Sequence, residues 1–181
     1  IGYNALGAMT TSSGYSVAIG DSALASVTTG NSNVAVGNNA LTANTTANNN
    51  TAVGYNSLLA NTDGTQNVVI GADAMKTATS DDGAVVVGYL AGRDMNGATH
   101  TTLLGSYSGL TITTGDKNTY IGTESGPQGA ASTGSNNVGV GYLSLSANTT
   151  GADNVAMGYN ALGGNTTGNF NVAIGYNAMS T

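Results

Sequence analysis

Apolar residues recur in a fixed pattern along the whole 181-residue chain. The motif has four residues, as in Val34-Ala35-Val36-Gly37. The first is Val or Thr, the second is usually small, the third is Ile, Val, Leu or Met, and the fourth is glycine. Most of these glycines lie 17 residues apart, while 19 residues separate Gly122 from Gly141 and 18 separate Gly2 from Gly20. The glycines that end the motif, here called anchor glycines, include Gly20, Gly37, Gly54, Gly71, Gly88, Gly105, Gly122, Gly141, Gly158 and Gly175. The pattern predicts a single repeat array over residues 1–181 of about ten units.

Positions are numbered from the anchor glycine of each repeat, so that position −1 precedes it and position +1 follows it. Side chains alternate between the two faces of a strand, so positions −3 and −1 share one face and position −2 lies on the other. Asn, Thr and Gly between the motifs are turn residues. Each repeat is therefore predicted to be a strand, a bend at the glycine, a second short strand and a loop. Seventeen residues suit one coil of an all-β parallel β-solenoid and are too few for a βαβ unit.

The residues at positions −2 and +4 vary together inside this one chain. A small residue at −2 goes with a large one at +4, as in Ala52 and Leu58, whereas Leu103 goes with Gly109. Interiors pack to nearly constant density, so the two columns are predicted to fill one shared space. Positions −3 and −1 form a second apolar face that one coil cannot enclose. We therefore expect a homo-oligomeric rod, in which the small residue at −2 lets neighbouring chains approach closely.

The motifs Ser16-Val17-Ala18-Ile19-Gly20 and Asn171-Val172-Ala173-Ile174-Gly175 resemble the head repeats of YadA-like trimeric autotransporter adhesins. The longer unit Asn154–Asn171, with its Tyr-Asn-Ala-Leu and Asn-Thr-Thr-Gly parts, is similar to repeats of phage tail fibres. The resemblance implies a left-handed β-roll and a homotrimer, with the rolls intertwined or side by side around a threefold axis. It also implies an extracellular location, on a virion tail fibre or a bacterial surface. The 17-residue period departs from the shorter coils of adhesin heads.

Composition narrows the range of functions. Only 7% of residues are charged, with 3 cations against 9 acids and a formal net charge of −6, so a nucleic-acid partner is not expected. There is no cysteine, which excludes thiol chemistry and cysteine-based zinc sites. No apolar run approaches the roughly 20 residues that span a bilayer, so we expect no membrane insertion of this segment. Because the chain begins at Ile1 inside a repeat, we expect it to be part of a longer fibre.

Candidate catalytic groups are few, and no catalytic, cofactor or metal site is expected. The only histidine, His100, has no second ligand near it in the sequence. A pair of carboxylates could cleave polysaccharide, as in a degrading tailspike. The acids that could form such a pair are Asp73, Asp81, Asp82, Asp94, Asp116 and Glu124. They fall at loop or bend positions and mostly replace Asn or Gly of the repeat, which favours a solvated surface; the degrading spike remains the alternative.

Tyrosine follows six of the anchor glycines and is predicted to form a partial ladder along one edge of the rod, including Tyr142, Tyr159 and Tyr176. Such a ladder is either a structural stack or a strip on which sugars stack, as in a lectin-like fibre. The Asn-x-Thr sequons in the loops are interpreted as turn residues, not as glycan acceptors. An ice-binding face is a minor alternative, because the chain lacks a regular Thr-x-Thr array.

The repeats over residues 73–135 depart most from the pattern and hold most of the charged residues. Loops on a rigid scaffold often carry recognition, so this region is a candidate patch for a host receptor or a surface glycan. Drift on an exposed surface explains the same residues equally well. The candidate patch is Lys76, Asp81, Asp82, Arg93, Asp94 and His100. The chain is expected to be a non-enzymatic segment of a trimeric fibre that extends or presents an attachment surface.

Overall fold

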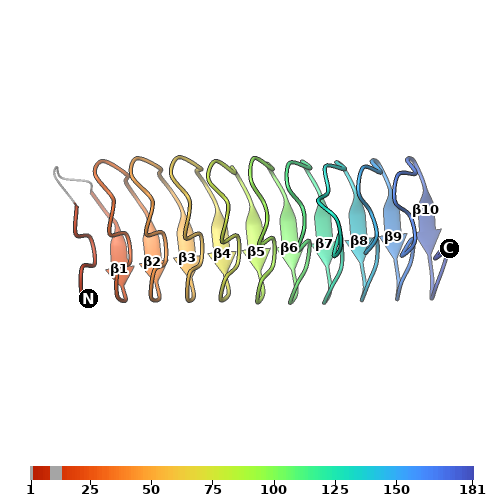
Figure 1. Ribbon diagram of the computed structural model, residues 1–181, viewed down its shortest axis with the longest axis horizontal. Helices are drawn as coiled ribbons and strands as arrows, with labels where there is room; N and C mark the ends of the chain where they lie inside the picture. Colours follow the sequence, from red (N-terminus) through yellow and green to blue (C-terminus); the bar gives the residue numbers. More distant parts are fainter. Residues whose placement is uncertain (1, 9–13) are drawn as a thin grey trace.

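The computed structural model describes residues 2–8 and 14–181 and forms one straight β-solenoid (Figure 1). Each repeat contributes one three-residue strand, and the ten strands form one parallel sheet in chain order. The strands are β1 (Val17–Ile19), β2 (Val34–Val36), β3 (Thr51–Val53), β4 (Val68–Ile70), β5 (Val85–Val87), β6 (Thr102–Leu104), β7 (Thr119–Ile121), β8 (Val138–Val140), β9 (Val155–Met157) and β10 (Val172–Ile174). The prediction of an all-β parallel solenoid with a 17-residue coil is confirmed.

Backbone hydrogen bonds between coils run along the rod. Equivalent positions pair throughout, as with Ala35 and Ala52. The amide of Val34 donates to the carbonyl oxygen of Asn50 at 2.8 Å, and the amide of Gly54 donates to the carbonyl oxygen of Val36 at 2.8 Å. Each coil therefore bonds the coil before it and the coil after it, and the rod extends without a change of register.

The anchor glycines are required by both backbone angle and space. Gly88 has a φ of +148°, a backbone conformation that residues other than glycine rarely adopt. A Cβ on Gly88 would also overlap the carbonyl oxygen of Gly105, the anchor of the following coil. The same overlap recurs from anchor to anchor along the rod. A residue with a side chain at this position would push successive coils apart.

The interior of each coil holds the side chains of positions −2 and +4, as predicted. A Cβ on Gly92 would lie 2.8 Å from Leu103, and a Cβ on Gly126 would lie 2.5 Å from the ring of Tyr120. Leu103 and Tyr120 are fully buried and occupy the volume that a leucine or methionine at +4 fills in other coils. The prediction that the small residue at −2 lets chains approach one another is wrong, because position −2 faces the interior of its own coil.

The segment after each anchor glycine is not the predicted second strand. Positions +2 and +4 adopt the left-handed conformation, as at Asn56 (φ 52°) and Leu58 (φ 50°), with the intervening residue in an ordinary conformation. This alternation folds the segment into turns and directs the residue at +4 inward. The strand and this turn segment form two opposite walls of the coil, with the −2 and +4 side chains between them.

The asparagines at position −4 form a buried ladder, although the sequence pattern suggested turn residues. Asn67 is fully buried, and its side-chain amide donates to Oδ1 of Asn50 at 3.1 Å and to the carbonyl oxygen of Asp81 at 2.7 Å. The backbone amide of Ala84 in turn donates to Oδ1 of Asn67 at 2.9 Å. The ladder joins the strand to the loop of the next coil and satisfies polar groups that water cannot reach.

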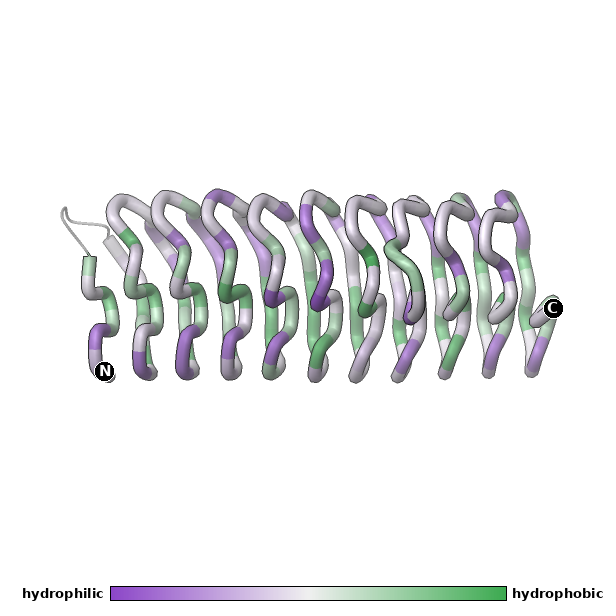
Figure 2. The backbone as a smooth tube through the Cα atoms, in the orientation of Figure 1, coloured by the Kyte–Doolittle hydropathy of each residue, from purple (hydrophilic) through white to green (hydrophobic). Residues whose placement is uncertain are grey.

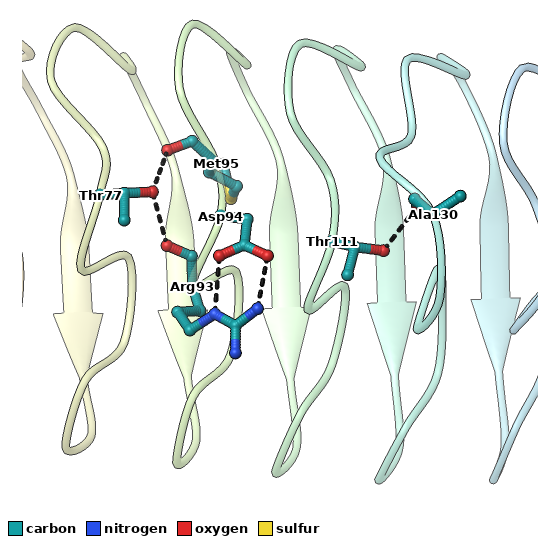
Figure 3. Close-up of polar contacts among 6 residues, drawn as sticks. All are labelled: Thr77, Arg93, Asp94, Met95, Thr111 and Ala130. Atoms are coloured by element: carbon teal, nitrogen blue, oxygen red, sulfur yellow. Dashed lines mark hydrogen bonds and ion pairs between the residues drawn. The ribbon is translucent and has the colours of Figure 1, made fainter.

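The two extra residues near Pro127 are accommodated in a loop, and the sheet continues unchanged. Thr111 donates to the carbonyl oxygen of Ala130 at 2.9 Å across this loop (Figure 3). The side chain of Gln128 donates to the carbonyl oxygens of Tyr107 and Gly126. Strand β8 then pairs with β7 in the regular register. The extra residue between Gly2 and Gly20 falls in a span that includes residues 9–13, which lie outside the described residues.

Candidate functional site

The outer face of the sheet is formed by positions −3 and −1 of β1–β10 and is here called the strand face. In β4, Val68 and Ile70 are 39% and 40% exposed, whereas Val69 between them is fully buried. None of the ten strands contains a charged residue. Figure 2 shows these apolar positions recurring from coil to coil along the rod. The strand face is therefore an uncharged, mainly apolar stripe in contact with solvent, with threonine at position −3 in β3, β6 and β7.

The size of the strand face is that of an interaction surface. Nine steps of roughly 4.8 Å along the rod and three residues of roughly 3.3 Å along each strand give an area of about 430 Å². Monomeric soluble proteins rarely expose apolar patches much larger than this, and patches of such size often serve binding. The stripe is also regular, since the same two positions are at least partly exposed in every strand, with a buried residue between them.

The structure places Tyr142, Tyr159 and Tyr176 in one column beside the bend at the anchor glycine. The ring centroids of Tyr142 and Tyr159 lie 5.6 Å apart, and those of Tyr159 and Tyr176 lie 5.0 Å apart with an interplanar angle of 14°. The negative charge of Glu124 raises the pKa of Tyr142. The rings face one another along the rod, so their edges and hydroxyl groups reach solvent more than their faces do. This arrangement favours a structural stack over a strip on which sugars stack.

Part of the candidate patch lies on the turn wall. Arg93 Nε and Nη2 each lie 2.6 Å from a carboxylate oxygen of Asp94, in a two-pronged ion pair (Figure 3). In the coil before that of Arg93, Lys76 Nζ lies 3.1 Å from Oδ1 of Asp73, three residues earlier in the same coil. Each cation is therefore paired with a carboxylate of its own coil, and the pairs are about one third exposed. Exposed pairs of this kind contribute little to stability.

The remaining patch residues lie in the loops before β5 and β6. Asp82 Oδ1 accepts hydrogen bonds from the backbone amide and the hydroxyl of Thr65, at 2.6 and 2.9 Å. The backbone amide of His100 donates to the carbonyl oxygen of Asp82 at 2.8 Å, and its side chain is exposed. Asp81 is fully buried. The expectation that Asp81 belongs to a solvated or receptor-facing surface is therefore wrong, because its side chain enters the interior at a position where most repeats have Gly.

Two of the candidate carboxylates, Asp82 and Asp116, are held by threonines of the preceding coil. Asp116 Oδ1 accepts hydrogen bonds from the backbone amide and the hydroxyl of Thr99. Asp82 accepts the same two bonds from Thr65, two coils earlier. Within residues 2–8 and 14–181, no three His, Cys, Asp or Glu side chains gather where they could hold a metal ion. The same residues enclose no pocket. No helix in the described part of the chain is long and apolar enough to cross a membrane.

Sequence reasoning missed a third interior column, at position −10. Asn occupies it in several coils, and Asn148 there donates to the carbonyl oxygen of Gly151 at 2.9 Å. In the middle coils the column holds Met95 and Ile112, both fully buried. Cβ atoms on Gly92 and Gly109 would lie 2.7 Å from these two side chains, respectively. Met95 and Ile112 each follow a +4 glycine by three residues, and this spacing was visible in the sequence, whereas Val27, also buried in this column, follows Leu24 by three.

These observations define a class of protein: a single-sheet parallel β-solenoid with a hydrogen-bonded, densely packed interior and one uncovered apolar face. Comparison of the chain with protein-family models, with curated proteins and with solved structures gives no match.

Proposed function

We propose that this chain is a structural and attachment segment of an extracellular trimeric fibre, carried on a phage tail or a bacterial surface, that extends or presents a receptor-binding surface. The observation that supports this proposal most directly is the strand face, which is mainly apolar and uncharged over ten strands. A rod with such a face is expected to associate through it. The left-handed winding and the threefold assembly are part of the proposal and rest on the resemblance to trimeric adhesins and tail fibres.

A second copy of the chain is the partner that fits the strand face best. The face repeats once per coil, at the strand spacing, over its whole length. A covering surface must therefore repeat with the same rise, and an identical rod does so coil for coil. Closed rotational symmetry then buries the face of every chain at once and leaves none open to further association. The backbone bonds along the axis would carry tension, while the loops would face solvent.

The alternative functions have less support. Polysaccharide cleavage needs two carboxylates on either side of a bound sugar. Asp82 and Asp116 are instead engaged by threonines, and Asp94 is paired with Arg93. Glycan stacking needs open ring faces, and the faces of Tyr159 are largely turned towards its neighbours.

The test is the oligomeric state of the chain and of a strand-face variant. Sedimentation equilibrium should give a trimer for the unmodified chain. Replacing Val68 and Ile70 by Lys places two charges on the strand face and should yield monomers. The matched control replaces Thr150 and Thr167, which are exposed in the loops, by Lys and should remain trimeric.

A soluble monomer for the unmodified chain would refute the proposed assembly. Equal oligomeric states for the two lysine variants would show that the strand face is not the contact. Circular dichroism of both variants separates loss of assembly from loss of folding. Binding to host cells by the trimer, absent in the monomeric variant, would then support the attachment role.

A further inference from the structure

Two buried oxygen atoms in neighbouring coils lack a hydrogen-bond partner. They are Oδ1 of Asn61 and Oδ2 of Asp81, and both residues are fully buried. Buried polar atoms are nearly always paired, because leaving one unpaired costs about 1–3 kcal/mol. Two orphaned acceptors in neighbouring coils therefore indicate that a donor is missing in this part of the interior.

The orphaned oxygen of Asn61 results from a break in the asparagine column at position −10. Where two successive coils hold Asn there, the later side-chain amide donates to the earlier oxygen, as Asn165 does to Asn148 at 3.3 Å. Asn61 donates in this way to Asn44 at 3.5 Å. In the following coil this position is Ala78, which has no amide to donate. Asn61 is thus the last residue in this run of asparagines at position −10.

Asp81 enters the interior in the same loop, three residues after Ala78. Its backbone nitrogen and Oδ1 of Asn61 border the same point, since a Cβ on Gly64 would lie 3.0 Å from the nitrogen and 2.5 Å from the oxygen. Oδ1 of Asp81 accepts a hydrogen bond from the backbone amide of Ala98 at 2.9 Å. Its Oδ2 has no hydrogen-bond partner.

We propose that Asp81 binds a proton within the folded rod and donates it from Oδ2 to Oδ1 of Asn61. A protonated carboxyl group supplies one O–H donor, which is what the interrupted column lacks. The acidic side chains of the adjacent loops, Asp63 and Asp82, would oppose a second negative charge here. The one histidine, His100, is exposed, and no lysine or arginine occupies these loops.

This site makes the stability of the rod depend on pH. Burial raises the pKa of Asp81, and hydrogen bonds from the backbone amides of Gly97 and Ala98 offset part of this effect. A carboxyl group whose pKa is raised by folding stabilises the fold fully below its unfolded pKa of 3.8. That contribution is lost as the pH rises from this value through the folded pKa. The rod should therefore loosen at this coil as the medium becomes less acidic.

The test compares melting temperatures of the full chain and its variants between about pH 4 and about pH 8. Asp81→Asn has nearly the same shape, carries a permanent donor and should remove the pH-dependent loss. The difference in melting temperature between Asp81→Asn and the unmodified chain should grow by several degrees as the pH rises. Asp153→Asn, at an exposed loop position four coils away, is the control and should keep the pH dependence of the unmodified chain. Asn61→Ala removes the acceptor and should shrink the effect of Asp81→Asn.

Infrared spectroscopy provides a readout that does not depend on stability. A protonated-carboxyl band should persist above the pH at which exposed acids ionise, and Asp81→Asn should abolish it. The absence of this band would overturn the proposal and indicate a bridging water or cation. A parallel pH dependence for the unmodified chain and Asp81→Asn would overturn it as well. Destabilisation by Asp81→Asn at every pH would show that the carboxylate itself is required.

Discussion

The packing of the interior can be tested by removing the side chain of Leu103 in β6. Leu103 is fully buried and fills space that Gly92 and Gly109 leave free on either side. Leu-to-Ala changes in such sites cost about 2–5 kcal/mol because a cavity remains. For a chain of this length, a loss of about 3 kcal/mol lowers the melting temperature by roughly 6–12 °C. Leu103→Ala should therefore be clearly destabilised.

The second half of this test restores the lost volume from the opposite wall. In the unmodified chain, Gly92→Ala would bring a Cβ to 2.8 Å from Leu103 and 2.7 Å from Met95. Such overpacking costs about 1–3 kcal/mol. When Leu103 is already Ala, the first of these clashes is gone, so Gly92→Ala should cost much less. Residues that share one space show coupling energies of about 0.5–3 kcal/mol. The coupling energy between Leu103→Ala and Gly92→Ala should fall in this range.

Urea unfolding followed by circular dichroism gives the four free energies of this cycle. Hydrogen exchange should locate the damage of Leu103→Ala in the coils around β5–β7, because each coil contacts only its neighbours. Gly14→Ala, far from Leu103 and with no atom within 4 Å of the added Cβ, serves as the uncoupled partner. If the two changes at Leu103 and Gly92 are simply additive, the shared-volume interpretation is refuted.

Three further predictions follow from the structure. Gly88→Ala should prevent folding of the coils around it, seen as a truncated protected core in hydrogen exchange, because its Cβ overlaps the next anchor glycine. Asn50→Ala removes a donor and an acceptor of the buried ladder and should cost about 2–4 kcal/mol in urea unfolding, against less than about 0.5 for the exposed Asn38→Ala. Burial acts to raise the pKa of Asp73, but its hydrogen bonds and Lys76 outweigh this and lower it. Stability should therefore fall as the pH drops below 3.8, and this fall should be smaller in Asp73→Asn, as measured by melting temperature.

Much of the fold is predictable from the sequence because a solenoid repeats one local solution. The anchor glycines mark the period directly, since each must allow a positive φ and a close approach of the next coil. Strand positions follow from two apolar residues around a small one, as in Val34–Val36. The pairing of Leu103 with Gly109 follows from the constant packing density of an interior. Each of these features depends only on residues within one coil or its neighbour.

The direction of each face is harder to predict. Alternation places position −2 opposite to −3 and −1, but it does not say which side the coil encloses. Bulk would suggest that Val and Ile point inward and Ala outward, and the structure has the opposite arrangement. The turn wall decides the matter, because its left-handed residues at positions +2 and +4 turn a leucine such as Leu58 towards position −2. Left-handed leucines have no sequence signal of their own, since this conformation is rare outside glycine and asparagine.

The candidate site was predictable only in outline for the same reason. An apolar face in excess of what one coil can bury is visible in the sequence, and the structure identifies it as positions −3 and −1. The charged residues of the middle coils suggested a patch, yet they divide between the turn wall, the loops and, for Asp81, the interior. Asp81 replaces a loop residue that is Gly in most coils, and only the loss of Asn at Ala78 makes room for it. A substitution inside a closed coil is tolerated when a neighbouring column changes with it. Correlated columns therefore reveal the interior. The outer face is free to remain uniform and to meet a uniform partner.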